Sequence, residues 1–245
     1  MPVIALQGIR GGTGTTSITA GLAWALRNLG KSVLVIDFAP DNLLRLYFNM
    51  PFKQSRGWAR ALMDNVPWQE SAMRYTKSLD FIPFGNTSKA DLLKLETKFQ
   101  SESNFWQLNI AQLIATGNYN WILLDLPTEN SILAKNGLAL ADHIICLLNP
   151  DMSCHVRLHQ QELPEHCHFL MNKYSSSNQL QQDLLQLWQY TVPDLLPLMV
   201  HYDGAVVEAL AVKQPPGEYS TRSLVTKELA ALAHWCVTKW EATTP

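Results

Sequence analysis

Glycines and hydroxyl side chains gather near the start of the sequence, where residues Gly8 to Ser17 read GIRGGTGTTS. Glycine adopts backbone conformations that other residues avoid, so a turn of this composition can direct its N–H groups toward an anion. A helix that begins directly after the turn adds a favourable partial charge from its N-terminus. The segment therefore indicates a phosphate-binding loop, although a glycine cluster by itself also occurs in ordinary turns.

The residues on either side must place this loop between a strand and a helix. Pro2 to Gln7 is a short apolar run, as expected for a buried strand, and apolar residues recur at helical spacing from Ile18 to Leu29. Gly30 is a typical helix end, and Ser32 to Asp37 is a second apolar run that ends in a carboxylate. Two parallel strands joined by a helix are therefore predicted, with the loop following the first strand.

The same alternation continues along the chain. Further strands are predicted at Leu79 to Pro83, Trp121 to Asp125, His143 to Leu148, His168 to Asn172 and Leu196 to Val200. Helices are predicted at Leu43 to Asp64, Lys89 to Thr116, Ile132 to Leu140, Ala205 to Val212 and Ser223 to Trp240. This pattern predicts one α/β domain over residues 1–245, a doubly wound, mainly parallel sheet with helices on both faces.

The composition is that of a globular protein and disfavours several classes of function. The chain has 245 residues, 47% of them hydrophobic, and its 19 Lys and Arg against 21 Asp and Glu give a net charge of −2. That balance disfavours nucleic-acid binding, and the apolar runs are far shorter than the roughly 20 residues that span a bilayer. The start of the chain lacks the basic leader of a secretion signal, so we expect a cytoplasmic protein whose 4 cysteines are free thiols.

The glycine loop resembles the deviant phosphate loop of the ParA and MinD ATPase family, whose pattern is Lys-Gly-Gly-x-Gly-Lys-Thr. The matching residues in this chain are Arg10-Gly11-Gly12-Thr13-Gly14-Thr15-Thr16. Arg10 takes the place of the family's first, signature lysine, and Thr15 takes the place of its second, phosphate-binding lysine. The resemblance thus implies a phosphate loop that lacks both lysines.

Later segments resemble the same family in the same order. Residues Asp37 to Asn42 read DFAPDN and are similar to the family's Asp-x-Asp-Pro-Gln-Gly. Residues Tyr119 to Pro127 are similar to its Walker B strand, in which Asp125 would support the magnesium shell. Two other segments are similar to the adenine-side strand and to the late Ile-Pro, Val-x-Glu-Ala and Pro-Val segment, namely Phe169 to Lys173 and Leu196 to Pro215.

The resemblance implies a deviant Walker-type P-loop NTPase of the SIMIBI class that binds ATP and Mg²⁺. Carried over residue by residue, the nucleotide-binding set is Arg10, Gly11, Gly12, Thr13, Gly14, Thr15, Thr16, Ser17, Asn172 and Pro197. The metal-binding set is Thr16, Asp37 and Asp125. Arg10 would reach across a homodimer that encloses two ATP, because a guanidinium binds phosphate oxygens bidentately; a solvated loop cation is the alternative.

The resemblance also implies slow or absent hydrolysis. In the family the second Asp of Asp-x-Asp positions the attacking water, and Ala39 stands at that position here. Each well-placed group lost costs ~3 kcal/mol of transition-state stabilisation, so losing this carboxylate and the loop lysine slows the reaction by roughly a hundredfold to ten-thousandfold. Because Asp37 or Asp41 could substitute, no catalytic residue is assigned and enzyme action stays open.

Within the family, the chain resembles the cellulose biosynthesis branch. The segments that carry this resemblance are Gly11 to Thr16, Pro40 to Leu46, Arg56 to Ala61, Arg157 to Gln161 and Lys213 to Pro215. It implies a scaffold or regulator of the bacterial cellulose secretion complex, in biofilm formation, peripheral to the inner membrane through that complex. The implied partners are a small BcsR-type subunit, a BcsE-type regulator and the synthase subunits BcsA and BcsB. An active ATPase switch that controls localisation and a nucleotide-independent structural subunit are the alternatives.

Three further features have more than one interpretation. Histidines and cysteines gather between Cys154 and His168, where ordinary helix residues are favoured over a zinc site. The apolar stripe from Leu224 to Trp240 is expected to pack on the chain's own sheet, with partner docking and direct lipid binding as the alternatives. Trp58 is either an exposed anchor or a core residue.

Overall fold

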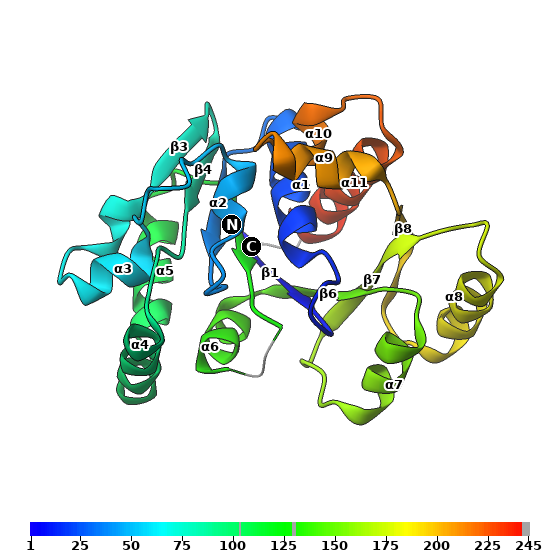
Figure 1. The fold of residues 1–245 in the computed structure, drawn as a ribbon, viewed down its shortest axis with the longest axis horizontal. Coiled ribbons are helices and arrows are strands. Elements are labelled where there is room, and N and C mark those ends of the chain that lie inside the picture. The colour runs from blue at the N-terminus through cyan, green and yellow to red at the C-terminus, as the bar shows by residue number, and fades with distance from the viewer. Residues whose placement is uncertain (103, 129–130, 242–245) are drawn as a thin grey trace.

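The computed structural model describes residues 1–102, 104–128 and 131–241, and a single sheet runs through its centre (Figure 1). The strand order is β3-β4-β2-β5-β1-β6-β7-β8, and every neighbouring pair is parallel except β3 with β4. The strands are β1 Val3–Gly8, β2 Val33–Asp37, β3 Met73–Thr76, β4 Leu79–Ile82, β5 Trp121–Asp125, β6 His143–Leu148, β7 Cys167–Tyr174 and β8 Leu195–His201. The predicted α/β class with a mainly parallel sheet is confirmed.

Helices cover both faces of the sheet (Figure 1). They are α1 Thr15–Asn28, α2 Leu44–Tyr47, α3 Trp58–Met63, α4 Lys89–Ser101, α5 Phe105–Ala115, α6 Ile132–Leu140, α7 Met152–Gln160, α8 Gln179–Thr191, α9 Gly204–Ala211, α10 Pro216–Tyr219 and α11 Leu224–Cys236. A 3-10 turn at Trp68–Ser71 and a π-helical turn at Val237–Glu241 complete the elements. The helices α1, α2, α9 and α11 pack on one face, and α3 to α8 pack on the other.

The sheet separates two hydrophobic cores. Ile4 and Leu6 of β1 belong to the core with α1 and α11, whereas Val3 and Ala5 belong to the core with α3 to α8. Successive side chains of a strand point to opposite faces, so a strand covered on both sides buries all of them. This is why the central strands appear in the sequence as unbroken apolar runs.

The segment between β2 and β4 differs from the prediction of one helix over Leu43 to Asp64, which is wrong. Only α2 and α3 are helical, and a loop separates them. Arg45 holds this loop by donating to the carbonyl oxygen of Gln54 at 2.8 Å and to those of two nearer loop residues. The next loop comes so close that a Cβ on Gly57 would lie 2.1 Å from the Gly85 nitrogen. Helical periodicity in the sequence cannot reveal such contacts between distant segments.

Other helices and strands also differ from those predicted from the sequence. The helix predicted over Lys89 to Thr116 is two helices, α4 and α5, and the sequence analysis did not predict β3 or α8. α8 has apolar residues at helical spacing, including the buried Leu184 and Trp188, so its pattern was available in the sequence and was overlooked. No helix in the described part of the chain is long and apolar enough to cross a membrane.

The packing tests the predictions for the apolar stripe of α11 and for Trp58. The stripe of α11 packs inward as expected, because Leu229 lies so close to α1 that a Cβ on Gly21 would be 2.4 Å from its Cδ1. Trp58 is fully buried, with ring centroids 5.5 Å from Phe38 and 4.9 Å from Trp106, so its interpretation as an exposed anchor is wrong. The four cysteines are free and buried.

Candidate functional site

The glycine loop joins β1 to α1 at the carboxyl ends of the parallel strands. Gly12 and Gly14 adopt φ values of 78° and 93°, in the left-handed region that favours glycine. The loop also folds back closely on itself, because a Cβ on Gly8 would lie 2.0 Å from the Thr13 hydroxyl oxygen. Backbone geometry therefore requires glycine at these three positions.

The start of α1 presents backbone N–H groups to the loop. Gly14 is the N-cap residue and offers no side-chain acceptor, and the first intrahelical bond runs from the Ile18 N–H to the Gly14 carbonyl at 3.0 Å. The N–H groups of Thr15, Thr16 and Ser17 therefore lack an acceptor within the helix. Together with the helix dipole they form a site suited to an anion.

The hydroxyl of Thr15 is used inside the loop. Thr13 and Thr15 are buried, and their hydroxyl oxygens are 3.3 Å apart. The Thr13 hydroxyl also donates to the Arg10 carbonyl at 3.1 Å. Thr15 thus offers its N–H group to an anion, while its hydroxyl stabilises the loop where a lysine would extend outward.

Two buried carboxylates end the neighbouring strands β2 and β5, where Asp37 and Asp125 are paired in register. They are 0% and 1% exposed, and one oxygen of each, Oδ2, has no hydrogen-bond partner. The other oxygen of Asp37 accepts from the Ala39 N–H at 2.9 Å, and that of Asp125 accepts from the Thr19 hydroxyl at 3.3 Å. The Thr16 hydroxyl lies close enough to Asp125 to lower the pKa of that carboxyl. The three residues of the predicted metal set therefore come together.

The electrostatics of this pair favour a bound cation. Burial raises the pKa of Asp37 well above its usual range, and the charge of Asp125 adds to the effect. Burial likewise raises the pKa of Asp125 to about 7. Buried carboxylates with open lone pairs are stable when they are protonated or bind a cation. Mg²⁺ commonly binds through one or two protein oxygens and completes its shell with water and phosphate oxygens, so Thr16, Asp37 and Asp125 fit that ion.

The position that would hold a water-activating carboxylate is apolar. Ala39 is 8% exposed and its methyl group can neither accept nor donate a proton. Asp41 is exposed, and its negative charge contributes to the raised pKa of both Asp37 and Asp125. The geometry can therefore hold a phosphate chain with a divalent cation. Asp41 is a nearby carboxylate whose charge affects both Asp37 and Asp125.

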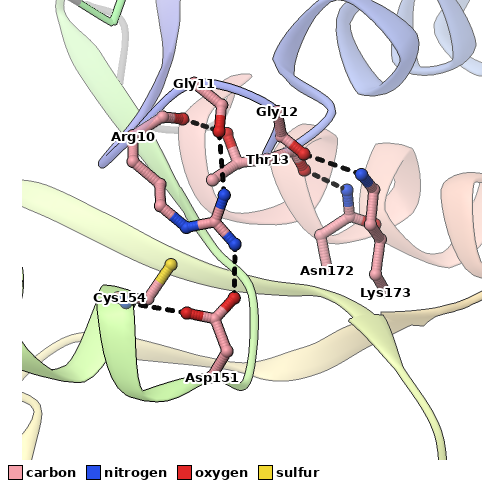
Figure 2. Close-up of polar contacts among 8 residues, drawn as sticks. All are labelled: Arg10, Gly11, Gly12, Thr13, Asp151, Cys154, Asn172 and Lys173. Carbon is pink, nitrogen blue, oxygen red and sulfur yellow. Dashed lines mark hydrogen bonds and ion pairs between the residues drawn. The ribbon is translucent and has the colours of Figure 1, made fainter.

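Arg10 turns back toward its own chain (Figure 2). Its guanidinium forms an ion pair with Asp151 and donates to the Gly11 carbonyl at 2.9 Å. The other oxygen of Asp151 caps α7 by accepting from the Cys154 N–H at 2.9 Å. The hydrogen bond to Asp151 raises the pKa of Arg10. The side chain is held by α7, so it must leave Asp151 before it can reach any partner.

Two side chains at the carboxyl end of β7 hold the loop from the other side (Figure 2). Asn172 donates to the Thr13 carbonyl and Lys173 donates to the Gly12 carbonyl, both at 2.7 Å. Lys173 adopts a φ of 58°, which is uncommon for a residue other than glycine. A Cβ on Gly14 would lie 2.7 Å from the Asn172 amide nitrogen. The structure therefore brings the predicted Asn172 to the loop and adds a cation beside it.

Pro197 is not brought to the loop. It is exposed in the edge strand β8, three strands away from β1 in the sheet order. Neighbouring strands are about 4.8 Å apart, so Pro197 lies roughly 14 Å to the side of β1. The resemblance identified its strand but carried no information on that lateral distance.

Sequence reasoning missed four residues that contact the site. Lys173 follows Asn172 directly in a segment that had been singled out, so its signal was available. Thr19, which bonds to Asp125, lies one helical turn beyond the loop. Asp151, and Tyr47 whose hydroxyl lies 2.8 Å from that of Ser17, come from distant segments and carry no local signal.

The histidine and cysteine cluster is engaged in packing. His155 accepts a hydrogen bond from the Trp188 indole at 3.1 Å, and its ring centroid is 4.8 Å from that of His159. In residues 1–102, 104–128 and 131–241, no three His, Cys, Asp or Glu side chains form a group that could hold a metal. These contacts join α7 to α8.

Comparisons with known proteins identify relatives across the whole chain. The family model described as cellulose biosynthesis protein BcsQ matches residues 1–237. The cellulose biosynthesis protein BcsQ of Escherichia coli K12 is 45% identical over 244 residues, which are 97% of this chain and 94% of that protein. The resemblance to the cellulose biosynthesis branch is therefore confirmed.

Solved structures show the same fold at much lower identity. The MinC:MinD cell division protein complex of Aquifex aeolicus aligns with a TM-score of 0.77 at 17% identity, covering 100% of this chain and 98% of that one. Cobyrinic acid a,c-diamide synthase from Mycobacterium smegmatis, with a bound ATP analog and magnesium, aligns with a TM-score of 0.73 at 19% identity, covering 100% and 97%. The chain therefore belongs to the family of the cellulose biosynthesis protein BcsQ and has the fold of the MinD and ParA ATPases.

Proposed function

We propose that this chain binds ATP with Mg²⁺ in the glycine loop and acts as a nucleotide-dependent scaffold or regulator of a cellulose secretion complex. One observation carries the nucleotide part of the proposal. Asp37 and Asp125 lie buried side by side, each with an oxygen that lacks a partner, next to Thr16 at the start of an uncapped helix. A Mg²⁺ ion with a phosphate chain would satisfy the carboxylates and the helix N–H groups together.

Slow hydrolysis is part of the same proposal. Phosphoryl transfer depends on groups that position the attacking water and stabilise the charge that develops on the phosphate. Ala39 cannot position water, and the Thr15 hydroxyl is occupied by Thr13, so both contributions are missing from their usual places. At ~3 kcal/mol for each, turnover falls by about two powers of ten for one loss and by about four if both losses add, which leaves ATP bound for long periods.

A homodimer around two ATP molecules is the assembly that we propose. Arg10 carries a permanent charge and binds a phosphate of the second copy once it exchanges Asp151 for that phosphate. Dimerisation would then depend on the nucleotide. Arg10→Ala is expected to abolish ATP-dependent dimerisation measured by light scattering, whereas Arg27→Ala, in the last turn of α1, should leave it unchanged.

The cellular setting rests on the family. Curated relatives named as cellulose biosynthesis proteins support a role in cellulose biosynthesis. We propose that the chain acts in the cytoplasm, peripheral to the inner membrane through the subunits of the cellulose secretion complex. A small BcsR-type subunit, a BcsE-type regulator, and BcsA with BcsB are the partners that we propose. Co-purification with tagged candidates from cells that make cellulose tests each of them separately.

An active ATPase switch is the second candidate function. The position of Asp41 near Asp37 and Asp125 favours this function, because the charge of Asp41 acts on both carboxyls. A carboxylate at that position can orient water in place of the one that Ala39 replaces. The steady-state rate of phosphate release separates the two functions. A rate near one per second supports the switch, and its loss in Asp41→Asn would identify the carboxylate.

The first experiment is to purify the protein without added nucleotide, together with any small subunit that co-purifies. Nucleotide released by denaturation is identified by chromatography, and the molar mass of the native sample is measured by light scattering. Two uncleaved ATP per dimer support the scaffold. ADP in a monomer supports the active switch, and a protein that neither contains nor binds nucleotide contradicts the proposal in favour of a structural subunit.

A further inference from the structure

A buried tyrosine joins the start of α1 to the segment that follows β2. Tyr47, the last residue of α2, is 2% exposed, and its hydroxyl oxygen lies 2.8 Å from the hydroxyl oxygen of Ser17. Ser17 is the third residue of α1, directly after Thr16. The pair thus connects the predicted nucleotide loop to a short helix that begins seven residues after Asp37 in the sequence.

The ring of Tyr47 has little freedom to move. It belongs to the same hydrophobic core as Leu44, Phe48 and the apolar face of α1. A packed aromatic ring has only two side-chain torsions, and burial restricts both. The hydroxyl of Tyr47 is therefore held at a defined point, and it holds the Ser17 hydroxyl in turn.

We propose that Tyr47 is a positioning residue for the bound nucleotide, which orients the Ser17 hydroxyl to donate a hydrogen bond to a phosphate oxygen. This inference rests on the proposed nucleotide site and deepens it. When a phosphate oxygen faces a neutral hydroxyl, the phosphate oxygen is the acceptor and the hydroxyl is the donor. The Ser17 O–H would therefore donate to the phosphate. The Ser17 oxygen then accepts from the Tyr47 O–H, and the two bonds polarise each other in the same direction.

The ionisation of Tyr47 is consistent with a donor role. Burial raises its pKa, and the nearby charge of Asp125 raises it further, whereas the hydrogen bond to Ser17 lowers it. The phenol is therefore protonated throughout the neutral range and can serve as the donor. A loop without the usual lysine depends more on such neutral donors, because the hydroxyl of Thr15 is already paired with that of Thr13.

A double-mutant cycle tests the proposal. The binding constants of Mg-ATP and Mg-ADP are measured by calorimetry for the wild type, Tyr47→Phe, Ser17→Ala and the double variant. A hydrogen bond of ordinary strength changes affinity by roughly two- to tenfold, so we expect a loss of about fivefold for Tyr47→Phe and about tenfold for Ser17→Ala. The double variant should bind within twofold of Ser17→Ala, because Tyr47 acts through Ser17.

A control separates this role from a general effect of removing a phenol that donates a hydrogen bond. The Tyr119 hydroxyl donates to Asp80 at 2.8 Å near the amino ends of β4 and β5, whereas the loop lies at the carboxyl ends of the strands. Tyr119→Phe therefore removes a similar bond far from the loop. It should bind nucleotide like the wild type. Ser17→Thr keeps a hydroxyl, and it should bind within threefold of the wild type while retaining its sensitivity to Tyr47→Phe.

The outcomes distinguish the inference from the proposal on which it rests. If the wild type binds Mg-ATP but Tyr47→Phe binds it equally well, or if the two losses add in the double variant, Tyr47 is only a core residue. If the wild type binds no nucleotide, the proposed function itself fails. Thermal unfolding of each variant without nucleotide is measured in parallel, and should Tyr47→Phe not fold, the affinities of Ser17→Thr and Ser17→Ala still test the donated bond.

Discussion

Replacing Asp125 with asparagine should stabilise the metal-free protein while it abolishes magnesium-dependent nucleotide binding. Burial raises the pKa of Asp125 from its ordinary value of 3.8 to about 7. One pKa unit corresponds to about 1.4 kcal/mol, so the ionised carboxylate costs up to about 4 kcal/mol of folding free energy. Asparagine has nearly the same shape without the charge, and its amide can donate to the unpartnered oxygen of Asp37.

The effect has a defined dependence on pH. Below about pH 4 the carboxyl is protonated in both the folded and the unfolded chain, so the charge has no cost. Between about pH 4 and pH 7 the unfolded chain has lost this proton and the folded chain retains it, so the stability of the wild type falls as the pH rises. Above about pH 7 the folded carboxyl is ionised too, and the cost stays constant.

The assay is thermal and urea unfolding in the presence of a chelator, from pH 5 to pH 8. At pH 8 we expect Asp125→Asn to raise the free energy of unfolding by about 2 to 4 kcal/mol, and the gain should shrink toward pH 5. Asp80→Asn is the matched control, because Asp80 is nearly buried but already paired with Arg74 and Tyr119, so its loss should destabilise the fold. The reasoning would be refuted if Asp125→Asn were less stable than the wild type at pH 8, or if its gain in the free energy of unfolding did not change with pH.

Three further changes have expected outcomes. Asp151→Asn releases Arg10, so nucleotide-dependent dimerisation should strengthen severalfold in light scattering, and weakening would contradict the ion pair as a restraint. Lys173→Met removes the bond to the Gly12 carbonyl but keeps the stem, so bound fluorescent ADP should dissociate about two- to tenfold faster in stopped flow; an unchanged rate argues against a role for that bond. Trp58→Ala empties a fully buried site and should lower the free energy of unfolding by about 3 to 5 kcal/mol, whereas a loss below 1 kcal/mol would show that the site collapses without cost.

Much of the central sheet and of the loop could be predicted from the sequence, because their signals are local. A strand buried on both faces is apolar along most of its length, and β1, β2, β5 and β6 all are, with polar residues only near their ends. A turn that needs positive φ and close backbone approach must contain glycine, as the φ of Gly14 and the crowding at Gly8 show. These constraints act within a few residues, so they leave a readable pattern.

The segments that were predicted wrongly, or not predicted at all, depend on contacts between distant parts of the chain. The loop after α2 is held by Arg45 and by the approach of Gly57 to Gly85, and neither contact changes the helical spacing of apolar residues. The antiparallel strand β3 is short and half exposed, so its pattern is weak. Pro197 was carried over from a motif; the order of strands in the sheet places it away from the loop, and its role in nucleotide binding stays a prediction.

By itself the sequence determined the α/β class, the position of the glycine loop between β1 and α1, and the identity of the carboxylates at the ends of two strands, because each depends on residue type and local spacing. Only the tertiary structure decided which distant side chains meet at that loop. Asp151 holds Arg10, Lys173 bonds to Gly12, and Tyr47 reaches Ser17, each across many residues of sequence. Such pairings arise when parallel strands bring their carboxyl ends, and the loops that follow them, to one edge of the sheet.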